Sequence, residues 1–390
     1  MSLKKMRYKG KKRIPFIRKK HSVYKEDEKF YIEFKKLCKS NYNEKDSVFF
    51  SFGYETFGII LYGFCKWLRD DLKKNKIKRI IFFSRDGYII REAFNLIEGS
   101  DEFQTDYMYV SRRSLRVPLL WKAEKKYREK AICATKYISI EDLFSSIGLE
   151  VSKYINILEK YGLKREQVIK DTEISNNNKS VSMLDDIWED VVDNSKVEYE
   201  NLKCYLEQFD LKKKVAVVDI GWRGSMQFFL SEMLKMMDLD IPVRGYYITL
   251  SSSMIKGMDA YGYLGNVDGL SNGCDLLRGY VGLIELMFLK VEGSVEKYMK
   301  SKDGLVKPKL YDFEYFIDGK YTSEVDAMTE IQRGALRFII DCEKTNLRKL
   351  NFNAATAFQN LNQIANHPRL KDVNLFRKFK FYNNGTKSYL

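Results

Sequence analysis

Residues 215–227 read Val215-Ala216-Val217-Val218-Asp219-Ile220-Gly221-Trp222-Arg223-Gly224-Ser225-Met226-Gln227. A short apolar run carries an acid near its end, passes through two glycines and continues in a helical pattern. This order predicts a buried strand, a tight turn and a helix. Peptide N–H groups in such a turn lie at the positive end of the helix and bind anions. We therefore expect a phosphate-binding turn here.

Two upstream segments have a similar design. Arg79-Ile80-Ile81-Phe82-Phe83 leads into Ser84-Arg85-Asp86-Gly87 and a helical pattern, and the apolar stretch 107–110 leads into Ser111-Arg112-Arg113-Ser114. Strand, helix and strand in succession predict a parallel sheet in an α/β, Rossmann-like fold. Two phosphate loops at one edge of that sheet favour a ligand with phosphate groups at both ends.

The rest of the chain divides around this core. We expect a basic tail and short helix at 1–45 and an α/β core at 46–270 with a helical insertion at about 121–210. A mainly helical region is expected at 271–390, including a long helix at about 325–345. At 390 residues, one catalytic domain with helical additions is the natural expectation.

The net charge of +15 is concentrated at the start of the chain. Residues 1–25 carry eleven of the 68 Lys and Arg and no acid, so the remainder is nearly balanced against 53 Asp and Glu. Such a tail suits an anionic membrane surface, and a solvated tail is the alternative. Nucleic acid is not the expected partner.

The cysteines and the hydropathy indicate a cytoplasmic protein that is at most peripheral to the inner face of a membrane. The six cysteines form no C-x-x-C pair, which favours free thiols in a reducing compartment. We find no uninterrupted apolar run of the roughly 18 residues that a membrane span needs.

Asp219 is the first candidate for chemistry, because the strand around it is otherwise apolar. Its carboxylate is expected at the carboxyl edge of the sheet, where open α/β folds bind ligands; capping the following helix is the alternative. The residues after it are candidates for phosphate or acceptor binding, and they are Gly221, Trp222, Arg223, Gly224, Ser225 and Gln227.

The two upstream loops supply further candidates. In the first, Arg85 can bind phosphate oxygens and Asp86 can hold magnesium through water; a salt-bridged turn is the alternative. In the second, Arg112 and Arg113 suit a diphosphate because guanidinium groups bind it bidentately; an exposed basic turn is the alternative. The other substrate-binding candidates in these loops are Ser84, Gly87 and Ser111.

The general base is expected to be a carboxylate, because the chain has only two histidines, His21 and His367. The catalytic candidates are Asp86, Asp219 and Glu285. Glu285 lies in an apolar run, so burial would raise its pKa, and an ordinary salt-bridged helix residue is the alternative.

These motifs resemble a known enzyme family. Residues 82–88, 109–113 and 217–227, with weaker support from 285–298, are similar to the phosphoribosyltransferase-type enzymes of bacterial polysaccharide assembly, such as O-antigen and capsule. Those enzymes move 5-phosphoribosyl from 5-phosphoribosyl-1-diphosphate (PRPP) to a glycan acceptor and release pyrophosphate. The resemblance covers roughly residues 50–300.

The resemblance implies roles for the loops. The Ser84–Gly87 loop would hold pyrophosphate, the Asp219–Gln227 loop would hold ribose 5-phosphate, and Mg²⁺ would be the cofactor. It also implies a lipid-linked glycan acceptor and a haloacid-dehalogenase-type phosphatase as partner. Nucleotide-salvage phosphoribosyltransferases carry two adjacent acids at the corresponding strand end, whereas Asp219 is followed by Ile220.

Two other functions fit parts of the pattern. Asp86 and Gly87 imitate half of the Asp-x-Asp-Gly loop of haloacid-dehalogenase-type phosphatases, but position 84 holds serine where the nucleophilic aspartate is needed. The second alternative is a noncatalytic scaffold that binds phosphate sugars at the membrane.

Overall fold

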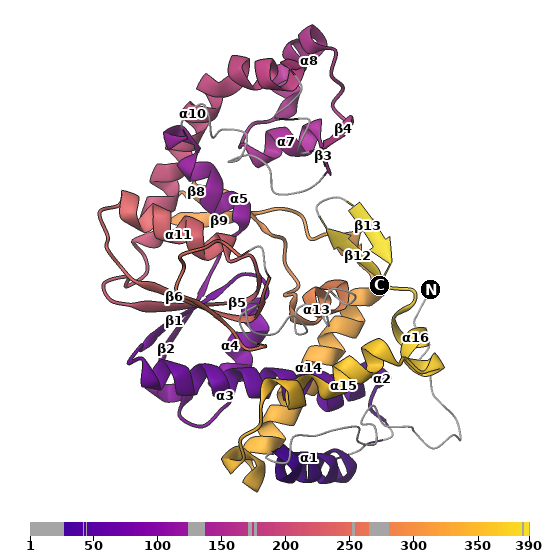
Figure 1. The fold of residues 1–390 in the computed structure, drawn as a ribbon. Helices are drawn as coiled ribbons and strands as arrows, with labels where there is room; N and C mark the ends of the chain where they lie inside the picture. Colours follow the sequence, from indigo (N-terminus) through magenta and orange to yellow (C-terminus); the bar gives the residue numbers. More distant parts are fainter. Residues whose placement is uncertain are drawn as a thin grey trace.

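The computed structural model describes residues 27–41, 43, 45–123, 137–170, 174, 178–251, 254–264, 281–383 and 386–389. Its centre is a five-stranded parallel sheet with strand order β2-β1-β5-β6-β7 (Figure 1). The strands are β1 (Arg79–Phe83), β2 (Gln104–Met108), β5 (Val215–Trp222), β6 (Val243–Leu250) and β7 (Ala260–Gly262). The α/β class and the parallel sheet are therefore confirmed. The basic tail at 1–25 lies outside the described residues.

Side chains alternate between two cores on the two faces of the sheet. Ile80 and Phe82 of β1 enter one core, and Ile81 and Phe83 enter the other. The first core includes residues of α3 (Gly58–Lys74), α4 (Gly87–Asn95), α13 (Val281–Phe288) and α14 (Ser323–Glu343). The second includes residues of α5 (Arg112–Arg116), α11 (Ser225–Met236) and the end of α10 (Asn178–Leu206). Strands covered on both faces are continuously apolar, as the sequence pattern required.

A long helical segment crosses beneath the sheet in Figure 1 and packs on α14. It consists of α2 (Val48–Phe52), the π-helical turn η2 (Gly53–Phe57) and α3. The helices approach closely at glycines: a Cβ on Gly53 would lie 2.0 Å from the Ile331 carbonyl oxygen. Residues 48–74 are long and apolar enough to span a membrane, but 89% of their most apolar window is buried in the structure. This helix serves the core, and its hydropathy does not decide where the protein resides.

The insertion forms a lobe at the top of Figure 1 with its own apolar core. It contains α7 (Ile140–Ser146), η6 (Val151–Tyr154), α8 (Ile155–Tyr161) and most of α10. It also contains an antiparallel pair, β3 (Tyr137–Ser139) with β4 (Val168–Lys170), which the helical prediction did not include. The pairing joins segments about 30 residues apart, so local periodicity did not reveal it.

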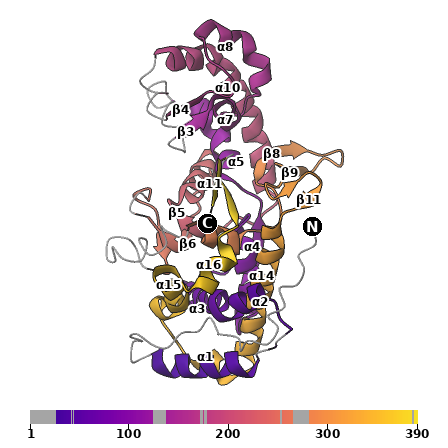
Figure 2. The same cartoon turned by 90° about the vertical axis from the view of Figure 1, so that its right-hand side faces the viewer.

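The C-terminal region contains strands that the prediction did not include. Alongside α13, α14, α15 (Ala354–Asn366) and α16 (Leu370–Phe376) it contains three antiparallel hairpins. These are β8 (Val295–Lys300) with β9 (Val306–Leu310), β10 (Phe316–Ile317) with β11 (Lys320–Tyr321), and β12 (Lys380–Asn383) with β13 (Thr386–Tyr389). Gly304 and Gly319 adopt positive φ in the first two turns, which glycine allows without strain. Figure 2 shows β8 and β9 standing out from the body.

The remaining elements are short or peripheral. They are α1 (Glu28–Ser40), η3 (Ser100–Glu102), η4 (Val117–Lys122) and η7 (Asn346–Lys349).

Candidate functional site

Two of the predicted loops meet at the carboxyl edge of the sheet because β1 and β5 are neighbours. Phe82 pairs with Val218, so Asp219 lies level with the end of β1, just before the Ser84–Gly87 loop. Asp219 itself lies inside β5 and pairs with Tyr247 of β6. The residue that caps α11 is Gly224, five positions later, so Asp219 does not act as the N-cap of that helix.

The turn after β5 requires its glycines. Gly221 has φ +125°, and a Cβ there would lie 1.9 Å from the carbonyl oxygen of Thr249 on β6. Gly224 has φ +68° at the start of α11, in the left-handed region that favours glycine. Between them, Trp222 also adopts a positive φ of 79°. The turn thus brings the first amides of α11 to the same edge of the sheet as Asp219.

Three carboxyl groups share this edge: those of Asp86, Asp219 and Glu285. Asp219 is only 6% exposed, and its Oδ1 is buried without a hydrogen-bond partner among the described residues. Burial, followed by the charge of Asp86, raises the pKa of Asp219 well above its usual range. Burial and the charge of Asp86 also raise the pKa of Glu285, to about 7. Burial raises the pKa of Asp86 to about 6, with a further contribution from Glu314.

Arg112 faces the same three acids, and its positive charge lowers the pKa of each of them. The side chain is exposed, and within the described part of the chain it makes no hydrogen bond or ion pair. A solvent-accessible guanidinium beside buried acids is available to an incoming anion, which distinguishes Arg112 from Arg85 and Arg113.

Arg85 is already engaged. One of its guanidinium nitrogens lies 2.7 Å from both carboxylate oxygens of Glu314 and donates to the Glu292 carbonyl at 3.2 Å. Ser84 is engaged as well, because its hydroxyl donates to the Val110 carbonyl (2.8 Å) and accepts from the Val110 N–H (2.9 Å). These bonds join β1 to the segment after β2. Ser84 and Arg85 therefore shape the loop. The sequence analysis predicted that their side chains bind substrate, but in the structure both are bonded to other parts of the protein.

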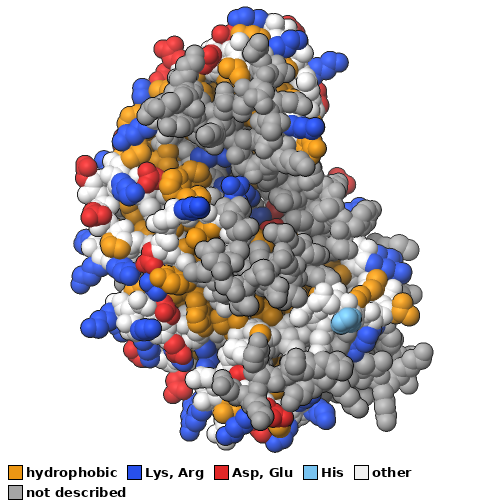
Figure 3. Space-filling model, viewed as in Figure 1, with side chains coloured by type: hydrophobic (Ala, Val, Ile, Leu, Met, Phe, Trp, Pro, Cys, Tyr) orange, Lys and Arg blue, Asp and Glu red, His pale blue; other side chains and the backbone are white. Residues whose placement is uncertain are grey.

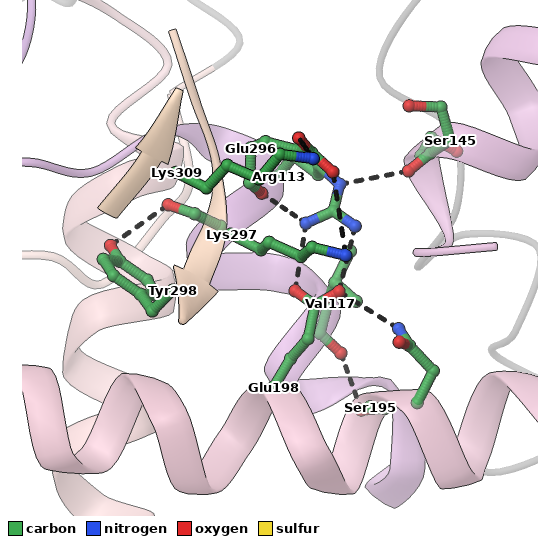
Figure 4. Close-up of polar contacts among 12 residues, drawn as sticks. Arg113, Val117, Ser145, Ser195, Glu198, Glu296, Lys297, Tyr298 and Lys309 are labelled. Carbon is green, nitrogen blue, oxygen red and sulfur yellow. Dashed lines mark hydrogen bonds and ion pairs between the residues drawn. The ribbon is translucent and has the colours of Figure 1, made fainter. Parts of the chain in front are cut away.

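The structure separates Arg113 from Arg112. Arg113 forms a two-pronged ion pair with Glu198 of α10 (2.9 and 3.0 Å) and donates to the carbonyls of Ser145 and Glu296 (Figure 4). It thus joins α5 to the lobe and to β8, and it does not reach the acid cluster. Ser111 caps α5 and donates to the Val295 carbonyl at 2.7 Å, so it is structural too.

The residues around the β5–α11 turn also divide into two groups. Gln227, predicted to bind substrate, is buried; it donates to the carbonyls of Val243 and Asp259 and accepts from the Tyr247 hydroxyl at 2.9 Å. Its amide fastens α11 to β6 and is not available to a ligand. Ser225 is half-buried at the start of α11, and Arg223 is exposed.

Two further residues belong to the edge. The indole N–H of Trp222 lowers the pKa of Glu285, although it makes no regular hydrogen bond within the described ranges. A Cβ on Gly87, the first residue of α4, would lie 2.9 Å from the Phe82 backbone, so this position needs glycine for close packing.

Glu314 and Glu292 are neighbours of the candidate site that the sequence analysis missed. Glu314 holds Arg85, while Glu292 accepts from the Tyr107 hydroxyl (2.6 Å) and pairs with Lys290 (2.7 Å). Glu314 lies 229 residues from Arg85 and outside the motifs considered above. Glu292 lies 185 residues from Tyr107, within the weakly similar segment 285–298, where the sequence did not single it out.

A divalent cation fits the edge only together with a ligand. Among the described residues, no group of three or more His, Cys, Asp or Glu side chains is arranged to hold a metal ion. Magnesium, however, is usually held by one or two carboxylates plus substrate phosphates. The unpartnered buried Oδ1 of Asp219 and the nearby Asp86 match that requirement.

The surface above the sheet is hollowed and basic. Figure 3 shows Lys and Arg side chains gathered around a hollow in the middle of the face, below the lobe. A different depression, of about 620 Å³, lies between α1 and the end of α14 and includes none of the acids of the cluster.

No model of a known protein family matches the chain, and no curated protein shows significant sequence similarity to it.

Proposed function

We propose that the protein transfers 5-phosphoribosyl from PRPP to a hydroxyl of a glycan acceptor and releases pyrophosphate, in bacterial cell-surface polysaccharide assembly. The observation that carries the proposal is the meeting of Asp86, Asp219, Glu285 and Arg112 at one sheet edge. A glycine turn leading into α11 borders the same edge.

The donor would lie across the edge from β5 to β1. The amides of Gly224 and Ser225, at the start of the twelve-residue helix α11, are suited to the 5-phosphate. Asp219 would accept hydrogen bonds from the ribose hydroxyls, which would satisfy its buried Oδ1. The diphosphate would lie toward the Ser84–Gly87 loop and within reach of Arg112.

Magnesium would be held by Asp86 through water and by the donor's own phosphate oxygens. When bound, it would neutralise phosphate charge that three neighbouring carboxylates would otherwise repel. The bound cation would therefore allow a diphosphate to bind beside acids whose negative charges already raise one another's pKa values.

In the reaction, the bond between ribose C1 and the diphosphate oxygen breaks and a bond from C1 to the acceptor oxygen forms. Arg112 stabilises the charge on the departing diphosphate, and Glu285 or Asp86 takes the acceptor proton. A carboxylate base contributes about 10² to 10⁴ in rate, and positioning and electrostatics contribute the larger share. The two arginines paired to Glu314 and Glu198 keep the loops in place.

The phosphatase alternative lacks its nucleophile, because position 84 holds a serine whose hydroxyl bonds Val110 at both backbone groups. The scaffold alternative differs from the proposed enzyme only in turnover. Measurements of binding and of product therefore separate all three functions.

Calorimetry with PRPP and Mg²⁺ on the wild type and on Asp219→Ala tests donor binding. We expect magnesium-dependent binding that Asp219→Ala abolishes and that Asp186→Ala, an exposed acid on the lobe, leaves unchanged. Phosphorus NMR with lipid-linked glycan acceptors then tests turnover. Absence of binding to the wild type would refute the proposal, and binding without pyrophosphate release across the acceptor panel would favour the scaffold.

A further inference from the structure

The β8–β9 hairpin exposes apolar side chains at its tip. Met299 is 47% and Leu305 54% exposed, at the two ends of the turn that joins the strands. Figure 2 shows this hairpin standing out from the body. Single exposed apolar residues are common on protein surfaces. A pair at the end of a protruding hairpin leaves apolar surface in contact with water, which is unfavourable unless a binding partner covers it.

The tip is also basic. Residues 297–309 contain five lysines and one acid, Asp303. Lys307 pairs with Asp303, and Lys297 and Lys309 pair with Glu296 at the base of the hairpin. Lys300 and Lys302 are exposed and have no ion-pair partner within the described ranges. Apolar side chains beside two unpaired lysines complement an anionic surface that has an apolar interior.

The turn is held in one conformation and does not fold its apolar residues inward. Asp303 accepts from the Leu305 N–H (3.1 Å) and from the Ser301 hydroxyl. The Ser301 N–H donates to the Leu305 carbonyl at 2.8 Å, and Gly304 adopts φ +83°. A fixed turn loses little conformational entropy when its tip inserts into a partner.

A second hairpin also exposes apolar side chains, although its turn carries the exposed Asp318 and a single lysine, Lys320. Phe316, Ile317 and Tyr321 of β10 and β11 are all exposed, and β11 lies on the same side of the molecule as β8 and β9 in Figure 2. Aromatic residues of this kind favour the boundary between lipid headgroups and acyl chains.

The base of the first hairpin is joined to the candidate site. Ser111, next to Arg112, donates to the Val295 carbonyl, and Arg113 donates to the Glu296 carbonyl (Figure 4). The segment between the two hairpins carries Glu314, the partner of Arg85. A surface that receives these tips would therefore stand at a fixed distance from the acid cluster.

We infer that the tips of the β8–β9 and β10–β11 hairpins dock on an anionic lipid bilayer. The occupant is a lipid surface because the tip combines unpaired lysines with exposed apolar side chains on a protruding turn. Docking is independent of the proposed activity, and it would bring a lipid-linked acceptor to the acid cluster if that activity holds.

The first test is co-sedimentation of the full chain with phosphatidylcholine vesicles, with and without phosphatidylglycerol. We expect binding to the anionic vesicles only. Each lysine near the surface contributes about 1 kcal/mol, so Lys300→Gln with Lys302→Gln should weaken binding about 30-fold. The matched control replaces Lys164 and Lys170, which are exposed on the lobe and without described ion pairs. The basic tail is present in all variants and cannot cause a difference between them.

The second test locates the contact. Leu305→Trp should add fluorescence that brominated phosphatidylcholine, mixed with phosphatidylglycerol, quenches. The control Val197→Trp, at a position 62% exposed on α10, should add fluorescence that is not quenched. Met299→Ser with Leu305→Ser should abolish the salt-resistant part of vesicle binding without lowering the melting temperature.

Absence of vesicle binding by the wild type, or vesicle binding with no quenching at position 305, would overturn the inference. Equal weakening by the tip and lobe lysine pairs would do so as well. Calorimetry with PRPP reports on the proposed function separately. Quenching at position 305 in a protein that binds no PRPP would support membrane docking and refute the proposed transferase activity.

Discussion

Asp86 lies in the loop after β1 and Asp219 lies in the adjacent strand β5, and the charge of Asp86 adds to burial in raising the pKa of Asp219. Two acids in this arrangement do not ionise independently. The positive charge of Arg112 opposes the effect at both. The site is therefore prepared for a ligand that brings cations or hydrogen-bond donors to the acids and anions to the arginine.

Asp219→Asn should increase the stability of the free protein at pH 8. The folded-state pKa of Asp219 lies above its unfolded value near 4, so the folded state binds more protons and stability falls as the pH rises above about 4. Asparagine removes this loss, and below pH 4 the two proteins should differ little. Urea unfolding across the pH range measures the effect, with Asp186→Asn as control. A variant less stable than the wild type at pH 8 would contradict the assignment.

Glu285→Gln should remove the rising limb from the pH–rate profile of the transfer reaction. A base must be deprotonated, so kcat/KM of the wild type should rise with pH through the pKa of about 7. The variant should lose about 10² to 10⁴ in kcat and show no such limb. Initial rates with PRPP and acceptor check this, with Glu232→Gln as control, because Glu232 is a half-buried acid of α11 that pairs with Lys235. Persistence of the limb in the variant would assign the proton to another group.

Arg112→Gln and Arg113→Gln should have opposite consequences although the residues are adjacent. Removing Arg112 takes away a charged partner of phosphate worth about 1.5–3 kcal/mol, so PRPP affinity should fall about 10 to 100-fold while stability changes little. Removing Arg113 leaves the buried Glu198 without its partner and should cost about 3–5 kcal/mol of stability. Calorimetry and urea unfolding of both variants give the comparison. Equal effects on donor affinity would place Arg113 in the site after all.

Gly221→Ala should destabilise the protein far more than Gly257→Ala. Both glycines have positive φ, which costs an alanine about 1–2 kcal/mol. Only at Gly221 would the Cβ also collide with a backbone oxygen, that of Thr249 at 1.9 Å, whereas at Gly257 nothing lies within 4 Å. We expect a total loss of at least about 3 kcal/mol at Gly221, measured by urea unfolding. Similar losses of stability at both positions would show that the positive φ alone, and not the collision with Thr249, determines the destabilisation.

Local pattern sufficed where a feature depends on neighbouring residues. The apolar run at 79–83, predicted as a strand, is β1, and the glycine turn after β5 leads into α11 at Ser225 as predicted. Hydrophobic runs and glycines carry this information because burial and φ are properties of a short segment. The hairpins of the C-terminal region were missed because their strands are only two to six residues long, which is too short to give a clear alternating pattern.

By itself, the amino-acid sequence determined the parallel sheet, its loops and the acids that those loops place at one edge. Only the tertiary structure decided which polar side chains are available there. Arg85 pairs with Glu314, Arg113 pairs with Glu198, and the Gln227 amide bonds the Val243 carbonyl of β6. Arg112 lies beside the acids and lowers their pKa values. The physical reason is that a buried polar group takes whichever partner the fold brings to it, and those partners lie up to 229 residues away.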